Sequence, residues 1–220
     1  MGGTGMEWLL GWLVAAGDPA LAAPLARVEE IYGQPVTVVS SPQAPQPAAV
    51  GMELFAGDQL RTGSHGRAQV QQSSGFFVRV GANAVLTVLP DNEVRFAQGR
   101  MITWVEGAVA RPVRIVTPLG VAALQGITLF VDAPEHGRWV RFFSWEGEIR
   151  ISAGRQSVTL NSGESVLVPR GATRLPRPYR LPGAVLRRQF QESVLLHGFG
   201  AAVATIGKIQ GMLESADAGE

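Results

Sequence analysis

Between residues 33 and 168, apolar and polar positions alternate in short runs that are separated by glycine, asparagine or aspartate. Alternation puts successive side chains on opposite faces, so each run buries one face and exposes the other. Before residue 184 no stretch has the apolar period of about 3.6 residues that a core helix needs. The pattern predicts an all-β domain of many short, mainly antiparallel strands, closed as a sandwich or a solenoid. The expected strands are residues 36–40, 57–63, 68–71, 76–81, 85–89, 93–97, 101–105, 109–116, 122–124, 128–132, 139–144, 148–152, 157–160 and 165–168.

The start of this domain leaves two readings open. Residues 23–32 fit either a short helix or a first strand. Pro42, Pro45 and Pro47 then predict a loop, because proline cannot donate a hydrogen bond to a central strand ladder.

The pattern changes after the last expected strand. Residues 169–183 are rich in proline and arginine, which predicts an extended connector. From Ala184 the apolar residues fall near helical spacing, with Gly198 and Gly200 marking a break. Together these patterns divide the chain into a signal peptide (1–22), a β-domain (23–168), a connector (169–183), a helical segment (184–214) and a frayed tail (215–220).

The N-terminus resembles a secretory signal. The apolar run Trp8–Ala16 is followed by Ala20–Ala22, a small-x-small sequence that a signal peptidase accepts, which predicts cleavage before Ala23. The run is shorter than the roughly 20 apolar residues of a membrane span, so no transmembrane span is expected. The missing Lys and Arg and the presence of Glu7 favour the alternative, an amphipathic helix packed on the domain. Export to the periplasm, with a membrane-associated location as a variant, is the prediction.

Composition and charge exclude several classes of function. The chain is 46% hydrophobic and 17% charged, which suits one main domain with a sizeable core. Its formal net charge is +1 and its arginines are dispersed, so it lacks the basic face that nucleic-acid binding requires. It has no cysteine, which excludes disulfides, thiolate metal sites and a cysteine nucleophile.

Glycine-led motifs recur along the domain in a fixed order. They include GMELFAGDQLRTG (51–63), SGFFVRV (74–80) and VTPLGVAALQGITLFV (116–131). In order and spacing the segments from about residue 28 to residue 168 resemble the FecR domain, the periplasmic part of ferric-citrate-type regulators. The chain departs from that family at Ser74, where an acidic residue is usual, and at Ile127 and Leu129, which replace the Thr and Phe of the family's TP…GTxFxV signature.

The resemblance implies an all-β domain that receives a signal from another envelope protein. FecR-like regulators add a cytoplasmic anti-sigma segment and a membrane span, and neither is recognisable in this sequence. We therefore expect a non-enzymatic periplasmic interaction or scaffold module with a protein partner in the envelope or at a membrane complex. The alternative is a ligand- or carbohydrate-binding sensor, with a glycan as partner.

The sequence offers little catalytic chemistry. His65, His136 and His197 are isolated and lack metal-ligand spacing, so exposed histidines are expected. Glu146 and Glu148 flank Gly147, and carboxylates beside a turn glycine are usually solvated. No nucleophile elbow or phosphate-binding glycine loop is present. We expect no catalytic residues, no metal and no cofactor.

Aromatic and arginine residues are the candidate partner contacts. Paired phenylalanines in a strand must point one ring to each face, so one ring of each pair is exposed unless something covers it. The alternatives are cover by the C-terminal segment and an open stacking platform for carbohydrate or peptide. The candidate contacts are Phe76, Phe77, Trp139, Phe142, Phe143, Arg174, Arg177, Arg180, Phe190 and Phe199.

Overall fold

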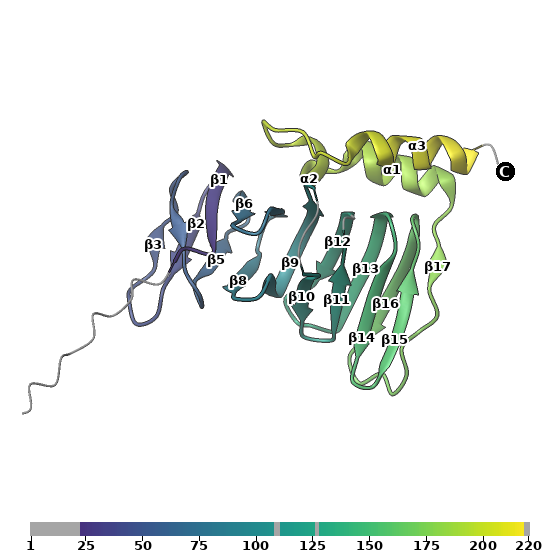
Figure 1. The fold of residues 1–220 in the computed structure, drawn as a ribbon, viewed down its shortest axis with the longest axis horizontal. Coiled ribbons are helices and arrows are strands. Elements are labelled where there is room, and N and C mark those ends of the chain that lie inside the picture. The colour runs from purple at the N-terminus through teal and green to yellow at the C-terminus, as the bar shows by residue number, and fades with distance from the viewer. Residues whose placement is uncertain (1–22, 108–110, 126–127, 218–220) are drawn as a thin grey trace, which may run out of the picture.

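The computed structural model of the chain describes residues 23–107, 111–125 and 128–217. The predicted signal peptide, Gly126 and Ile127 of the resemblance, and the end of the predicted tail lie outside these residues. Strands occupy most of the described chain, and the helices follow at its C-terminal end (Figure 1). The all-β prediction with a C-terminal helical segment is therefore confirmed.

Within the described residues the structure has seventeen strands. They are β1 (Ala26–Tyr32), β2 (Val36–Val39), β3 (Gln46–Pro47), β4 (Glu53–Leu54), β5 (Gln59–Thr62), β6 (Arg67–Gln72), β7 (Phe76–Val80), β8 (Val85–Leu89), β9 (Glu93–Val105), β10 (Val113–Thr117), β11 (Gly120–Leu124), β12 (Thr128–Ala133), β13 (Trp139–Glu146), β14 (Ile149–Ala153), β15 (Gln156–Leu160), β16 (Glu164–Pro169) and β17 (Tyr179–Arg180). The segment that fitted a helix or a strand is the strand β1. The proline-rich loop contains the two-residue strand β3.

The strands form two layers that share one member. The first layer, sheet A, has the order β4-β1-β6-β7-β9-β12-β13-β16-β17. The second layer, sheet B, has the order β3-β2-β5-β8-β9-β10-β11-β14-β15. Neighbouring strands are antiparallel except β9 and β10, which are parallel.

Strand β9 passes from one layer to the other. Its first half pairs with β8 in sheet B, and its second half pairs with β7 and β12 in sheet A. The sequence predicted two strands here, whereas the structure has one strand of 13 residues. Gly99, at φ +101°, lets the chain bend without ending the strand, and a Cβ there would lie 2.6 Å from Ala84.

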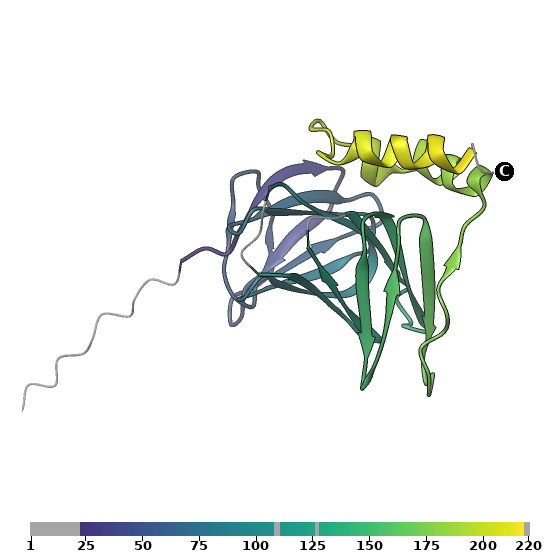
Figure 2. The ribbon, with the colours of Figure 1, turned by 45° about the vertical axis from the view of Figure 1, so that its right-hand side comes forward.

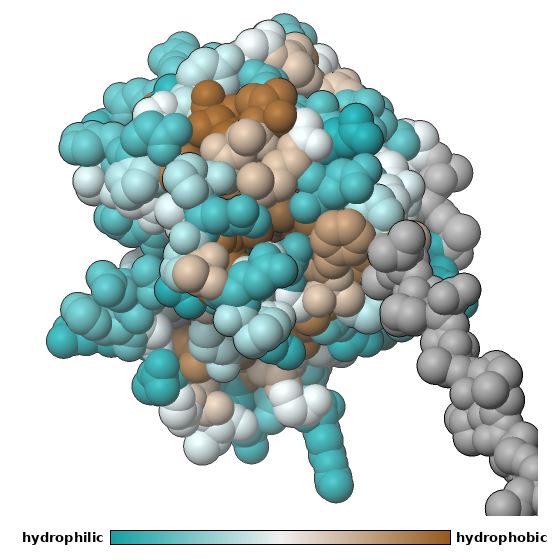
Figure 3. Space-filling model, turned by 90° about the vertical axis from the view of Figure 1, so that its left-hand side faces the viewer, coloured by the Kyte–Doolittle hydropathy of each residue, from teal (hydrophilic) through white to brown (hydrophobic). Residues whose placement is uncertain are grey.

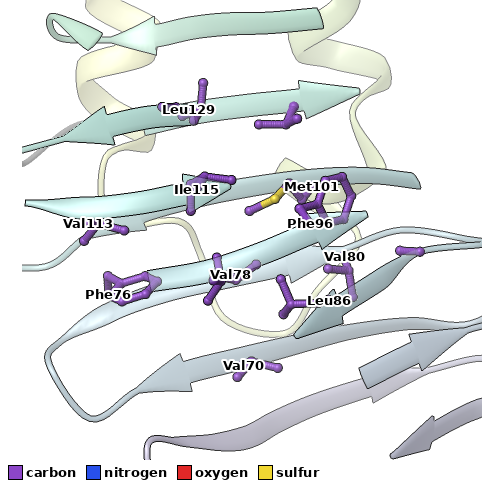
Figure 4. Close-up of a cluster of buried hydrophobic side chains, with 14 of the residues drawn as sticks. Val70, Phe76, Val78, Val80, Leu86, Phe96, Met101, Val113, Ile115 and Leu129 are labelled. Atoms are coloured by element: carbon purple, nitrogen blue, oxygen red, sulfur yellow. The ribbon is translucent and has the colours of Figure 1, made fainter. Parts of the chain in front are cut away.

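The main core lies between the two layers. Inward side chains of sheet A, among them Val70, Val78 and Leu129, meet those of sheet B, among them Leu86 and Ile115 (Figure 4). All five are fully buried. Alternation along each strand supplies these residues, as the sequence pattern predicted.

Three helices cover the outer face of sheet A. They are α1 (Gly183–Glu192), α2 (Val194–His197) and α3 (Ile206–Asp217), and they lie together along one side of the strands (Figures 1 and 2). Their apolar residues, including Leu186 and Ile209, pack on Trp104, Phe143 and Trp145 in a second hydrophobic cluster. In the described part of the chain, every helix is too short or too polar to cross a bilayer.

The connector between the sheets and the helices is partly fixed to the domain. β17 pairs with β16, and Leu175 packs against the main core. Gln156 of β15 donates to the Thr173 carbonyl at 3.1 Å and accepts from the Leu175 amide at 2.8 Å. The connector therefore follows the edge of the sheets on its way to α1.

Candidate binding cleft

The helical layer accounts for most of the predicted aromatic contacts. Phe76 and Phe142 point inward between the sheets, and both are fully buried. Phe143 points outward but lies under the helices and is 1% exposed. The prediction that these three rings contact a partner is wrong for the folded chain, because the sheet layers or the helices enclose them.

The other predicted aromatic contacts are half-buried. Phe77 stacks on Trp104 with ring centroids 5.2 Å apart, and Phe199 meets Tyr32 edge-on at 5.4 Å. Phe190 packs edge-on against Trp145 and His197. Trp139, at the start of β13, is also half-buried. The C-terminal segment thus packs over Phe77, Trp104 and Phe143.

The three predicted arginines lie on the surface. Arg174 and Arg177 are exposed in the connector, and Arg180 is exposed on β17. The exposed large apolar side chains of the described residues are Val50, Phe55, Tyr179, Val185 and Val194. On the face shown in Figure 3, hydrophobic residues form small patches between hydrophilic ones.

A buried arginine fixes the helices to sheet A. Arg79 of β7 is fully buried, and its Nε donates to Gln69 Oε1 at 2.7 Å. Its Nη1 donates to the carbonyls of Leu195 and Leu196 at 2.9 and 3.1 Å, and its Nη2 donates to that of Ala201 at 2.5 Å. These carbonyls belong to α2 and the turn after it, where backbone acceptors lack helical partners. Arg79 therefore supplies the hydrogen-bond donors for the free backbone carbonyls at the C-terminal end of α2 and in the turn after it.

Aromatic rings and a carboxylate complete this attachment. The guanidinium of Arg79 lies 4.9 Å from the ring centre of Trp104 and 4.4 Å from that of Phe199. Burial lowers its pKa to about 10, with the charge of Glu30 acting in the other direction, so Arg79 stays charged at neutral pH. Glu30 Oε2 accepts from the Gly200 amide at 2.7 Å and from the Tyr32 hydroxyl at 3.0 Å.

The pKa of Glu30 reflects the same contacts. Partial burial opposes its ionisation, but hydrogen bonds from Gly200, Ala201 and Tyr32 and the charge of Arg79 outweigh burial. The net result is a pKa below the ordinary value of 4.5. The ionised carboxylate thus helps to hold the turn between α2 and α3 on the sheet.

One end of the outer face of sheet A stays open. There a cleft of about 860 Å³ separates the sheet from the end of α1 and the start of α2. Sheet residues Arg67, Arg100, Asp132 and Arg141 line one wall. The opposite wall includes Glu192, Ser193 and Val194. A second recess, beside β1 and β6, is smaller at about 300 Å³, and we take the larger cleft as the candidate functional site.

The charged groups of the cleft are loosely paired. Asp132 Oδ2 lies 3.4 Å from Arg100 Nε and 3.6 Å from Arg141 Nη2. Residues 132 and 141 face each other across β12 and β13, so the sheet register places them together. The Arg141 guanidinium also lies 5.6 Å from the ring centre of Phe130. Both distances from Asp132 exceed the roughly 3.2 Å limit of a strong charged hydrogen bond, so Asp132 holds neither arginine tightly.

Three N–H groups of the cleft residues are buried without a partner. They are Nε1 of Trp145, Nε of Arg141 and Nε of Arg67. Trp145 as a whole is 2% exposed. Buried N–H donors almost always have an acceptor, so the three unpartnered donors of these cleft residues are unusual.

These cleft residues were not among the candidate contacts predicted from the sequence. Arg141 and Trp145 share the outer face of β13 with Phe143, and a charged residue at alternate spacing with buried aromatic rings was the available signal. Arg67 and Arg100 come from other strands, so only the strand pairing brings them near.

The groups considered for chemistry remain apart. His65, His136 and His197 are all exposed. Glu146 pairs with Lys208 Nζ at 3.3 Å, while Glu148 is exposed beyond the turn at Gly147. Residues 23–107, 111–125 and 128–217 contain no group of three or more metal-ligating side chains placed to hold a metal ion.

Part of the chain matches a known protein family. The fold and cleft define a two-layered all-β module with a helical cover, and residues 58–150 match the family model described as FecR protein. Residues 58–150 are therefore similar to the FecR domain, the family that the motifs of the sequence indicated. The matched residues run from the start of β5 into β14, and thus include both layers and β9.

Solved structures give a weaker likeness. Two crystal structures of a candidate anti-sigma factor from Parabacteroides distasonis ATCC 8503 align with TM-scores of 0.49 and 14% sequence identity. Each alignment covers 60% of this chain and 64% of the other, so this chain spans less than two thirds of that protein's length. No curated protein sequence matches the chain.

Proposed function

We propose that this chain is an exported, non-enzymatic interaction module of the bacterial cell envelope, which acts in the periplasm by binding a protein partner. The FecR-like domain supports a signalling role for it. The proposed site of binding is the cleft between sheet A and the helices.

The unpartnered donors of the cleft are the observation that carries this proposal. A partner that fills the recess supplies acceptors to groups that the chain itself leaves unsatisfied. A protein is favoured over a glycan, because Phe77, Trp104 and Phe143, which could have formed a sugar-stacking platform, pack under the helices.

The compartment can be tested by labelling, since the chain has no native cysteine. Ala82 is exposed and lines the cleft, so Ala82→Cys offers a single accessible thiol. A membrane-impermeant maleimide should label this variant in cells whose outer membrane alone has been permeabilised. Labelling that occurs only after the inner membrane is broken would show a cytoplasmic protein and contradict the proposal.

The partner can be tested by affinity purification from envelope fractions in mild detergent. The wild-type chain should retain a stoichiometric protein, and Arg141→Gln should lose it. Arg114→Gln is the matched control, because Arg114 lies on β10 of sheet B and pairs there with Glu93. Equal retention by the two variants, or no stoichiometric protein with the wild type, would contradict binding at the cleft.

A further inference from the structure

We infer that the cleft recognises one Asp or Glu carboxylate on an extended segment of the partner, with Arg141 as its charged contact. This inference rests on the proposed function and specifies the chemistry of the same site. Four features of the cleft support it: its unsatisfied donors, the geometry of Arg141, its charge balance and its apolar rim.

The unsatisfied groups all have the same polarity. Trp145 Nε1, Arg141 Nε and Arg67 Nε are donors, and each is buried. An unmet buried donor costs about 1–3 kcal/mol, so a ligand that supplies acceptors recovers energy that the free chain gives up. A carboxylate and the backbone carbonyls beside it are acceptors only, which matches this set.

Arg141 is placed to receive a carboxylate. Its Nη2 lies 3.6 Å from Asp132, too far for a strong hydrogen bond, and its Nε has no partner. A guanidinium binds a carboxylate best through two parallel N–H groups, and Nε with Nη2 can form such a pair. Because Nε is shielded from solvent in the free chain, the Arg141 side chain must turn to present both groups to the ligand. Phe130 lies against the guanidinium and helps to fix its plane.

The charge balance favours a single carboxylate over a phosphate. Glu192 is neutralised by Arg188, with Oε1 and Nε 3.1 Å apart. The other charged lining residues are three arginines, at positions 67, 100 and 141, and two acids, Asp132 and Glu135. The cleft thus has one cation in excess, which suits one carboxylate, while its own acids repel a doubly charged phosphate.

The rim of the cleft suits a peptide. Val194 is 48% exposed at the start of α2, and Ala82 and Pro134 lie on the opposite side. An apolar residue next to the acidic one can bury surface on Val194. An extended segment supplies these side chains. It also supplies backbone carbonyls as acceptors for Trp145 Nε1 and Arg67 Nε, which have no hydrogen-bond partner.

Indole NMR signals offer a direct test on the full chain. The chain has five tryptophans, and Trp145→Phe assigns the Trp145 indole signal. The probe is the peptide acetyl-Ala-Leu-Glu-Leu-Ala-amide, and its Gln counterpart is the matched control. We expect a saturable shift of the Trp145 signal with the Glu peptide, and at least tenfold weaker binding of the Gln peptide.

Variants separate recognition from a general loss of structure. Arg141→Gln should weaken the Glu peptide at least tenfold, Arg141→Lys should weaken it less, and Arg114→Gln should leave it unchanged. The other indole signals report whether each variant is folded. Equal binding of the Glu and Gln peptides, no saturable shift, or binding unaffected by Arg141→Gln would overturn the inference.

Two further results distinguish this inference from the proposed function. Tighter binding of a phosphoserine peptide than of the Glu peptide would show that the assigned ligand class is wrong. If the peptides fail but Arg141→Gln still releases the purified partner, the partner-binding function stands and only the carboxylate assignment falls. A cytoplasmic location would instead contradict the proposed function.

Discussion

At the scale of single residues, Arg79 joins sheet A to the helical segment. It is fully buried, and it connects Gln69 of the sheet with three carbonyls of the helical segment. A buried cation is costly unless its donors are satisfied, and here four acceptors and two aromatic rings surround it.

Arg79→Gln should therefore destabilise the chain strongly. Its shorter side chain leaves the Leu195, Leu196 and Ala201 carbonyls unpaired, and we expect a loss of about 3 kcal/mol in the free energy of unfolding. Arg61→Gln is the control, because the exposed side chain of Arg61 donates to Gln59 in the same strand; it should change stability by less than about 0.5 kcal/mol. Urea unfolding measures both, and similar losses would contradict this role of Arg79.

The contacts of Glu30 predict a pH effect. Its folded-state pKa lies below 4.5, so its ionised form stabilises the fold above that value, and the stabilisation is lost as the pH falls through the folded-state pKa. Glu30→Gln should be less stable than the wild type at neutral pH, with a difference that shrinks as the pH falls below about 4.5.

Urea titrations at several pH values test this prediction. Glu53→Gln is the control: Glu53 is exposed on β4 and lies 3.6 Å from Arg27, so it should produce a small difference at every pH. A stability difference for Glu30→Gln that stays constant from neutral pH to below pH 4 would show that the charge of Glu30 does not matter.

At the scale of elements, Gly99 determines the path of β9. Alanine there must adopt φ +101° and also overlap Ala84. Alanine at Gly107, at φ +82°, meets nothing within 4 Å. Both changes cost about 1–2 kcal/mol for the backbone conformation, and Gly99→Ala adds about 1–3 kcal/mol for the clash. Chemical denaturation of the two variants compares them, and equal losses would mean that the close approach at Ala84 is easily relieved.

At the scale of the whole molecule, the helical layer should open before the sheets. Strand pairing joins the two sheets through β9, whereas the helices are attached through side chains and the contacts of Arg79 and Glu30. We expect amide protons of α1 and α3 to exchange with solvent at a lower free energy than those of β7 and β13. Hydrogen exchange by NMR measures this, and equal protection of helices and strands would indicate one cooperative unit.

The sequence pattern predicted strands well where alternation is local. The strands expected at residues 76–81 and 139–144 form as β7 (Phe76–Val80) and β13 (Trp139–Glu146). It did not predict that β9 is continuous, because a glycine within a strand and a glycine in a turn look alike in sequence. It also did not reveal that Arg79, a polar position in an alternating strand, is buried, since its cover comes from residues more than a hundred positions later.

The cleft could not be predicted from the sequence, because its residues meet only through tertiary contacts. Asp132 and Arg141 meet through strand pairing, and Ser193 and Val194 join them through helix packing. Neither relation leaves a periodic trace along the chain. The sequence identified the right kinds of residue, arginine and aromatic side chains, but placed several of them on a surface that the fold encloses.

The shared strand β9 has a mechanical consequence. Because one continuous segment is hydrogen-bonded into both layers, the layers cannot slide past each other unless that segment breaks its pairings. Arg100 of the cleft lies on this strand, immediately after the bend at Gly99. We therefore expect a displacement of β9 at the cleft to be transmitted to sheet B through the hydrogen bonds of the same strand.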